Sequence, residues 1–255
     1  MVLADALSGG LAVGRRAAGL ALNTVLPPQC LSCGAGVDTP GAVCADCWTA
    51  LVFIVPPHCV ACGFPFEHEH GADTLCGACS RTAPPFARAR AVLRYDDASR
   101  GLLLGFKHGD RTYAAPAFGR WLARAGGELV ADVDLVAAVP LHWSRLALRR
   151  YNQAALLALA LAREAGVDAA PDLLVRRRRT RSQGGLSRSG RARNVAGAFA
   201  VRRGAEESVA DRRVLLVDDV YTTGATLMEC TKVLRRAGAA EVEVLTLARV
   251  VRPQT

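Results

Sequence analysis

From about residue 85 onward, apolar positions along the chain alternate between the spacing of strands and the spacing of helices. Short apolar runs typical of strands occupy residues 87–96, 134–140, 196–201, 214–220 and 241–250. Apolar positions at helical spacing predict helices at residues 98–110, 112–126, 153–166 and 225–238. This alternation predicts an α/β fold with a parallel sheet flanked by helices on both faces. Ligands of such sheets lie beyond the carboxyl ends of the strands.

The N-terminal residues have their own amphipathic pattern, and residues 4–24 are predicted to form a helix that packs on the body of the protein. The pair Arg15-Arg16 is followed by a short apolar run without an A-x-A cleavage site, so the segment does not fit an export signal. No stretch approaches the roughly 20 apolar residues needed to span a bilayer. We therefore expect a cytoplasmic protein.

The composition changes after Pro84 and Pro85, and this change divides the chain into three expected parts. They are an N-terminal helix at 1–24, a cysteine-rich domain at 25–84 and an α/β domain at 85–255. A chain of 255 residues is long enough for one good-sized core and a small accessory domain.

Eight of the nine cysteines fall into two matching sets, C-x2-C-x10-C-x2-C and C-x2-C-x13-C-x2-C. A C-x2-C turn points two thiolates at one ion, and tetrahedral zinc takes four soft ligands. The simplest pairing is sequential, and the spacing also allows a cross-braced one. Sequential pairing gives one zinc on Cys30, Cys33, Cys44 and Cys47 and another on Cys59, Cys62, Cys76 and Cys79.

Zinc in such a segment is expected to be structural, because the segment has too few apolar residues to fold without metal. Protein ligands fill all four positions and leave none for a reactive water. Disulfides are disfavoured without a secretory signal, and an iron–sulfur cluster fits the paired turns less well. His58, His68 and His70 could substitute as ligands but are expected to be solvated loop residues.

A formal charge of +9 suggests an anionic partner such as nucleic acid or a phosphate-rich substrate. Two observations weaken this interpretation. The chain has 30 arginines and only 2 lysines, a bias that GC-rich coding produces by itself. Eight zinc-bound thiolates would also lower the net charge to about +5. A solvated basic surface is therefore the favoured reading of the charge.

The stretch VLLVDDVYTTGAT, residues 214–226, carries the most informative chemistry. An apolar strand leads to Asp218 and Asp219, expected where the strand leaves the sheet. Two adjacent carboxylates repel each other unless something shared, such as a ribose diol or a cation, satisfies both. Thr222, Thr223, Gly224, Ala225 and Thr226 then form a turn that opens a helix, where free amides and short hydroxyls meet an anion. The pattern describes a ribose 5-phosphate site.

This stretch resembles the signature of type I phosphoribosyltransferases that binds phosphoribosyl pyrophosphate (PRPP). With the cysteine block upstream, the chain from about residue 20 onward resembles the ComF (ComFC-like) competence family, phosphoribosyltransferase-like proteins with an N-terminal double zinc ribbon. The likeness lies in LLLGFKHGD (102–110), VPLHWSRLALRRYNQA (139–154) and TRSQGGLSRSGRARNVAGAF (180–199). One position departs from the family pattern R-G-F/Y-N-Q, since Arg150 stands where glycine is usual.

The resemblance implies roles for these residues. Asp218 and Asp219 would hold the ribose hydroxyls, and residues 222–226 the 5-phosphate. Mg²⁺ and the basic loop after Val139 would meet the pyrophosphate. The candidate residues of that loop are Arg145, Arg149, Arg150, Asn152 and Gln153.

Lys107 could reach the pyrophosphate or the acceptor, or be a solvated cation at a helix end. His142 could carry a proton or be a polar loop residue.

Residues 176–194 are charged and poor in apolar side chains, and they resemble a flap that closes over PRPP. Thr180, Gln183, Arg191 and Asn194 match the family pattern there. The run RRRRTR could instead contact single-stranded nucleic acid, but it lacks interleaved aromatic residues that stack bases.

Three functions remain open at this point. The chain could be an active phosphoribosyltransferase, a DNA-uptake factor that acts on single-stranded DNA or a helicase partner, or a regulator that binds PRPP without turnover. The acceptor would be recognised by a hood formed by residues 85–130 and the zinc block. The sequence shows no aromatic sandwich or amide pair there that would identify the acceptor.

Overall fold

A computed structural model describes residues 27–68, 71, 73–109, 111–180 and 187–251. The helix predicted at 4–24 and the flap residue Gln183 lie outside these residues. No helix in the described part of the chain combines the length and the apolar character needed to cross a membrane.

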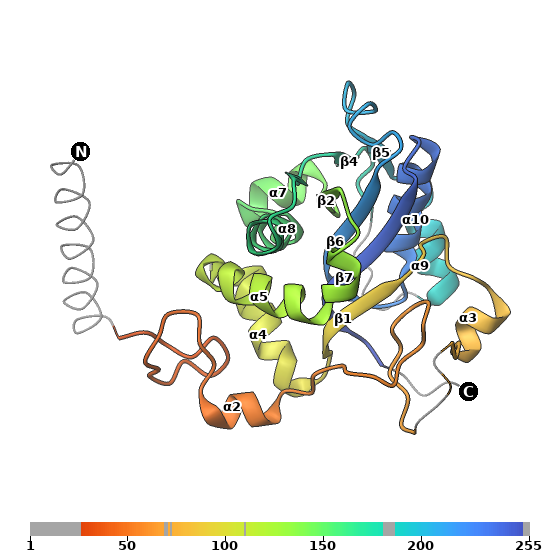
Figure 1. Cartoon of the computed structure of the whole chain (residues 1–255). Coiled ribbons are helices and arrows are strands. Elements are labelled where there is room, and N and C mark those ends of the chain that lie inside the picture. Colours follow the sequence, from red (N-terminus) through yellow and green to blue (C-terminus); the bar gives the residue numbers. More distant parts are fainter. Residues whose placement is uncertain (1–26, 69–70, 72, 110, 181–186, 252–255) are drawn as a thin grey trace, which may run out of the picture.

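The centre of the molecule is a parallel sheet of five strands in the order β1-β7-β6-β2-β3 (Figure 1). A separate antiparallel pair, β4-β5, lies beside it. The bounds are β1 Ala89–Arg94, β2 Leu135–Ala138, β3 Ala169–Ala170, β4 Leu174–Arg176, β5 Phe199–Val201, β6 Arg213–Tyr221 and β7 Glu241–Arg249. The predicted α/β class with a parallel sheet flanked by helices is confirmed.

Helices cover both faces of the sheet. Helices α5 and α8 pack on one face and α10 on the other, where α9 and the β4-β5 pair also lie (Figure 1). The helices of the α/β part are α4 Asp97–His108, η1 Thr112–Ala114, α5 Ala115–Ala125, α6 Gly127–Val130, α7 Trp143–Arg149, α8 Gln153–Ala165, α9 Arg188–Val195 and α10 Ala225–Arg236. Each predicted strand and helix of this part corresponds to an observed one, with shifted ends.

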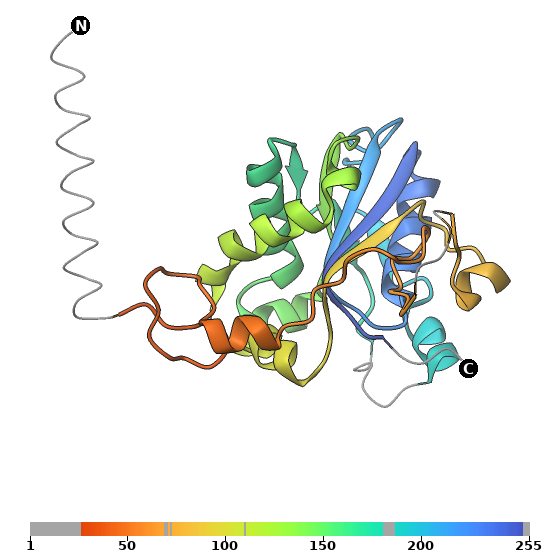
Figure 2. The same cartoon turned by 60° about the horizontal axis from the view of Figure 1, so that its bottom comes forward.

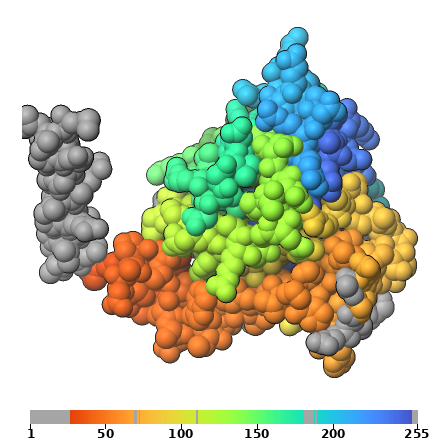
Figure 3. Space-filling view, viewed as in Figure 1, coloured from red at the N-terminus to blue at the C-terminus, as the bar shows by residue number. Residues whose placement is uncertain are grey.

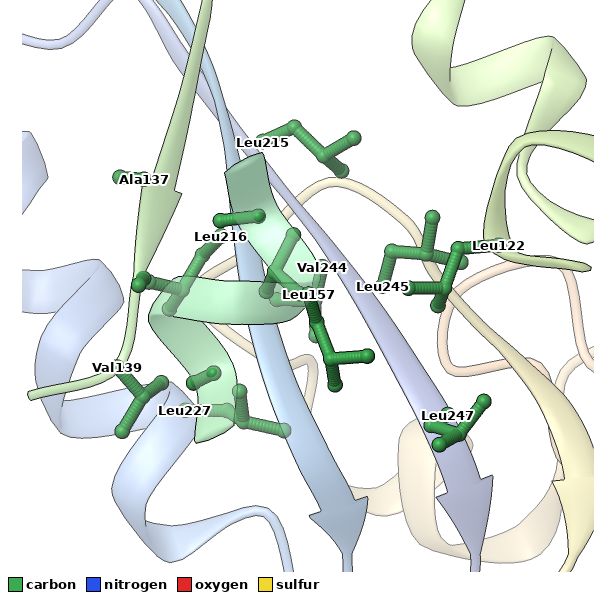
Figure 4. Close-up of a cluster of buried hydrophobic side chains, with 14 of the residues drawn as sticks. Leu122, Ala137, Val139, Leu157, Leu215, Leu216, Leu227, Val244, Leu245 and Leu247 are labelled. Carbon is green, nitrogen blue, oxygen red and sulfur yellow. The ribbon is translucent and has the colours of Figure 1, made fainter. Parts of the chain in front are cut away.

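The two central strands are apolar on both faces because helices cover both. Val214, Leu215, Leu216 and Val217 of β6 are completely buried. Figure 4 shows this core, with Leu122 of α5 beside Leu245 of β7 and Leu227 of α10 near Val139. Burial of such leucines contributes roughly 2 kcal/mol each, and the packed core fixes where the polar strand ends lie.

Asp218 and Asp219 lie in the last part of the strand, in line with the strand predicted at 214–220, and β6 runs on to Tyr221 because β7 continues alongside. The segment after Val139 differs from the prediction. The basic loop after Val139 contains a helix, α7, whose first turn is capped by His142, with Nδ1 accepting from the Ser144 N–H at 3.3 Å. His142 is thus a buried helix cap.

The cysteine-rich segment lies along one side of the α/β body (Figure 3). It contains two short helices, α2 Ala45–Ala50 and α3 Gly77–Arg81, which lie at opposite sides of the sheet in the two views of Figures 1 and 2. The segment also extends the sheet, since Ile54 N–H donates to Val92 of the edge strand β1 at 2.8 Å.

Candidate functional site

The carboxyl ends of β2 and β6 form the switch point of the sheet. From β2 the chain crosses to β3 on one side, and from β6 it crosses to β7 on the other. The last pair between β2 and β6 joins Ala138 to Val217, whereas β6 continues along β7 to Tyr221. A cavity of about 720 Å³ opens where β2 has ended. Open α/β sheets bind ligands at such a point.

Residues from four parts of the chain meet in this cavity. They come from α4, from the segment after β2, from the base and far end of the flap, and from the turn after β6. The predicted site residues in its lining are Lys107, Arg145, Arg149, Asn152, Gln153, Arg191, Asp218, Asp219, Thr222, Gly224, Ala225 and Thr226.

The two aspartates have different partners because side chains alternate along a strand. Lys107 Nζ of α4 lies 2.6 Å from Asp219 Oδ2. Asp218 Oδ1 accepts the backbone N–H of Asp219 at 2.8 Å and lies in the field of Arg176. Burial and repulsion by Asp219 raise the pKa of Asp218 to about 7. The cavity therefore holds one carboxyl that is easily protonated near neutral pH and one that is paired.

The turn after β6 has the geometry of an anion site. Gly224 has φ +77° and is the N-cap residue of α10, where it offers no side-chain cap to the first turn of this helix. The amides at the start of a helix carry partial positive charge and favour an anion. Thr223 does not line the cavity, and its buried Oγ1 has no hydrogen-bond partner within the described residues. The turn thus has polar groups that its own structure leaves unused.

The basic residues of α7 face the same cavity. Arg145 Nη2 donates to the backbone oxygen of Thr180 at 3.1 Å, and Arg149 Nη1 to Gln153 Oε1 at 3.4 Å. Burial and the nearby charges of Arg149 and Arg179 lower the pKa of Arg145. An anion that binds between such crowded cations relieves their mutual repulsion.

Asn152 and Gln153 hold the walls of the cavity in place. Asn152 caps α8 by accepting from the Ala154 N–H at 3.2 Å, and its amide donates to the backbone oxygen of Val139 at 3.1 Å. Gln153 Nε2 donates to the backbone oxygen of Lys107 at 2.9 Å. These bonds tie the ends of β2, α8 and α4 together, so both side chains serve to position Lys107 and the basic helix.

The flap residues are only partly brought to the cavity. Arg191 of α9 lines it, whereas Thr180 is buried beside it and accepts a hydrogen bond from Arg176. Asn194 lies near the end of α9, where its backbone oxygen accepts from Arg178 at 3.2 Å. The flap is thus anchored at both ends, at the β4-β5 pair and at α9.

The eight cysteines form two tetrads with sequential pairing, Cys30, Cys33, Cys44 and Cys47 in one and Cys59, Cys62, Cys76 and Cys79 in the other. Within each tetrad all four sulfur atoms lie within 4.8 Å of one another, a spacing that fits tetrahedral zinc. The donor sets therefore fit two structural zinc ions with no open position.

Known protein families and relatives match large parts of the chain. A double zinc ribbon domain matches residues 21–86, and a phosphoribosyl transferase domain matches residues 152–254. Competence protein F of Haemophilus influenzae is 34% identical over 179 residues, which are 68% of this chain and 78% of that protein. DNA utilization protein YhgH of Escherichia coli is 35% identical over 192 residues, 72% of this chain and 81% of that protein. The chain belongs to the ComF family.

Among solved structures, a glutamine PRPP amidotransferase from B. subtilis covers 56% of this ComF chain with 19% identity and a TM-score of 0.40, and 30% of that chain is matched. This likeness is too distant to add to the argument. The phosphoribosyltransferase-like fold rests on the strand order and on the domain match.

Arg150 shows what the departure from the ComF pattern does to the backbone. It ends α7 with φ +67°, the left-handed conformation that glycine adopts without cost. The backbone at this position therefore has a conformation that suits glycine and carries the strain of a side chain there. Arg150 lines a smaller neighbouring cavity of about 340 Å³ that shares Lys107 and Arg145 with the main one.

Sequence reasoning missed Arg176 as a pocket residue of this ComF protein. Arg176 ends β4, lines the cavity and lies over the Phe199 ring, with 5.1 Å from Cζ to the ring centroid. Its Nε is buried without a partner in the described part of the chain. The only signal was its position at the end of a short apolar run, and in sequence it is indistinguishable from the exposed Arg177, Arg178 and Arg179 that follow.

Proposed function

We propose that this ComF protein binds PRPP with Mg²⁺ in the switch-point cavity and is a phosphoribosyltransferase. The observation that carries the proposal is the meeting, in one cavity, of the carboxylates at the end of β6, the uncapped turn before α10 and the cations of α7 and α4. PRPP is a diol with a phosphate at one end and a diphosphate at the other, and these three groups match its three parts.

Each part of the cavity would take one part of the ligand. Asp218 and Asp219 would accept hydrogen bonds from the ribose hydroxyls, and the amides of residues 222–226 would bind the 5-phosphate. Arg145, Arg149 and Arg176 would bind the pyrophosphate. Bound Mg²⁺ neutralises part of the diphosphate charge.

Transfer from PRPP passes through a ribose with cationic character, so catalysis depends on stabilising the leaving group and on excluding water. The diol would compete with Lys107 for Asp219, and Lys107 would then be free to donate to the pyrophosphate oxygen that leaves. Closure of the flap by way of Thr180 and Arg191 would exclude water.

Calorimetry with PRPP and Mg²⁺ tests the binding step. The double variant Asp218→Asn/Asp219→Asn should lose at least about tenfold in affinity, because two carboxylate acceptors become weaker neutral ones. Asp172→Asn is the control, since Asp172 is an exposed partner of Arg202 on the β4 side. Equal affinity of the wild type and the double variant would defeat the pocket assignment.

Turnover is tested separately, by pyrophosphate release from PRPP in the presence of nucleobases. Release that requires Lys107 would support an enzyme. PRPP binding without release of pyrophosphate in the presence of any of the acceptors would favour a PRPP-responsive regulator.

The names of the relatives suggest a second role, in competence and DNA uptake, and one observation favours direct contact with single-stranded DNA. Trp143 of α7 is 72% exposed on the same helix as Arg145 and Arg149, and the exposed Arg177, Arg178 and Arg179 directly precede Thr180, whose backbone oxygen accepts a hydrogen bond from Arg145. Aromatic rings among arginines bind single strands by stacking and by phosphate contacts. A helicase partner would use the same exposed surface.

Binding of a fluorescent oligonucleotide tests this role. Trp143→Ala and Arg177→Ser/Arg178→Ser/Arg179→Ser should each weaken binding, and the arginine variant should flatten its salt dependence. Absence of binding at micromolar protein would count against a direct DNA contact. We place this protein in the cytoplasm, where reduced thiolates persist as zinc ligands.

A further inference from the structure

Arg249, the last residue of β7, extends from the sheet to the second zinc tetrad. It is 7% exposed. Its Nη1 donates to the backbone oxygen of Cys62 at 2.6 Å, and its Nη2 lies 3.4 Å from the Cys62 sulfur. A hydrogen bond to a metal-binding thiolate fixes the orientation of the ligand and strengthens its hold on the ion. Arg249 therefore connects the α/β sheet with one zinc ligand.

The same guanidinium lies over the ring of Tyr221, with 4.2 Å from Cζ to the ring centroid. Tyr221 ends β6 and is the register partner of Arg249 across the β6-β7 pair. The Val250 N–H also donates to the backbone oxygen of Tyr221 at 2.9 Å. A planar guanidinium that both stacks and donates hydrogen bonds holds the ring in one position.

Tyr221 in turn supports the phosphate-binding turn. A Cβ placed on Gly224 would lie 2.7 Å from Cε2 and from the hydroxyl oxygen of Tyr221, so the ring is in direct contact with the backbone of the turn. A shift of this ring changes the space next to the amides that begin α10. The contacts thus run without a gap from Cys62 through Arg249 and Tyr221 to Gly224.

We propose that Arg249 is a positioning residue that couples the second zinc site to the phosphate-binding turn. The inference rests on the proposed PRPP function and adds a regulation of the same site. Zinc fixes the four thiolates of the tetrad when it is bound. Zinc at this site then raises the affinity for PRPP by a certain factor. PRPP raises the affinity for zinc at this site by the same factor, because coupling between two ligands is reciprocal.

The zinc ribbon also has a contact that serves as a matched control. Arg90 of β1 is as buried as Arg249, at 6% exposed, and its Nη1 donates to the backbone oxygen of Val60 at 3.1 Å. Arg90 thus docks the same ribbon to the sheet through β1, whereas Arg249 also contacts Tyr221. Loss of Arg90 removes this docking contact and an ion pair with Glu128, and it leaves the contact between Arg249 and Tyr221 in place.

The first tetrad lies on the other side of the sheet and provides a second control. Its helix α2 packs on α5, with the ring centroids of Trp48 and Trp121 5.7 Å apart. Cys33 is the exposed ligand of this tetrad. Cys33→Ser should weaken only the first zinc site and leave PRPP affinity unchanged.

The experiment measures PRPP affinity by calorimetry and zinc affinity by competition with a chelator, on the zinc-loaded full chain. Arg249→Met should weaken PRPP binding about tenfold and zinc binding at the second site about 10- to 100-fold. Arg90→Met should change PRPP affinity less than about twofold. Equal PRPP affinity of Arg249→Met and the wild type, or an equal loss in Arg90→Met, would overturn the coupling.

A measurement that does not need Arg249→Met covers the case in which this variant does not fold. Saturating PRPP should tighten the chelator-competed second zinc site by the same factor of about ten, and Cys33→Ser identifies which step of the titration is the first site. PRPP binding without this tightening would overturn the coupling and leave the proposed function in place. No PRPP binding at all would overturn both.

Discussion

At the scale of single residues, the cavity holds partly buried charges that contribute little to the stability of the fold. Asp218 is held next to Asp219 and away from water, and its pKa rises to about 7 for these two reasons. Arg176 has a buried Nε with no partner among the described residues, and Arg145 is crowded by the charges of Arg149 and Arg179. Such arrangements lower stability and are typical of binding sites.

The raised pKa of Asp218 predicts a pH-dependent stability difference. The unfolded carboxyl releases its proton near pH 3.8 and the folded one near pH 7, so its contribution to stability is fully present below about pH 3.8 and is lost progressively as the pH rises from there through about 7. The stability of Asp218→Asn relative to the wild type should therefore be higher at pH 8 than at pH 4 by more than about 1 kcal/mol. Denaturant unfolding at both pH values measures this; an unchanging difference between the two proteins would contradict it.

Arg150 predicts a second stability effect. Arg150→Gly should raise the free energy of unfolding by about 1 kcal/mol, because glycine adopts φ +67° without the clash of a side chain. Asp211→Gly is the control, since Asp211 has φ +57° and aspartate tolerates this region better. Denaturant midpoints compare the two; a loss of stability in Arg150→Gly would show that its side chain contributes contacts that outweigh the strain.

At the scale of elements, the turn between β6 and α10 carries the largest share of the proposed function. Gly224→Ala should abolish detectable PRPP binding, because the added methyl meets the Tyr221 ring at 2.7 Å and the residue needs φ +77°. Gly166→Ala is the matched control, with φ +68° and open space around the added carbon. It should lose about 1 kcal/mol of stability and keep PRPP affinity. Equal PRPP binding by both variants would remove the turn from the site.

The ribbons predict a metal content of about two zinc ions per chain. By elemental analysis, the zinc content should fall to about one ion per chain in Cys33→Ser and in Cys76→Ser. The second change should also destabilise the α/β body more, since Cys76 is buried with the core and Cys33 is exposed. One zinc or none in the wild type would contradict the two tetrads.

Most elements could be predicted because their apolar spacing is set by burial in the sheet and its covering helices. Helix α7 could not, because its segment is short and arginine-rich and its first turn depends on a cap by His142. The expected divisions of the chain at residues 24 and 84 stay predictions.

At the scale of the whole molecule, the site is assembled by parts that lie far apart in sequence. The DDVYTTGAT stretch could be found by its pattern, since one short segment supplies both carboxylates and the turn. Arg176 and Arg249 could not, because an arginine at a strand end gains its role only from what the fold places beside it. The double zinc ribbon matters in this account both for the fold and for the turn that it supports through Tyr221.

The most direct test of the central claim is a crystal structure of the zinc-loaded chain with PRPP and Mg²⁺. We predict the 5-phosphate at the amides of residues 222–226, the ribose hydroxyls at Asp218 and Asp219, and the pyrophosphate between Lys107 and the arginines of α7. PRPP bound elsewhere on the protein, or a switch-point cavity left empty at saturating PRPP, would contradict the account.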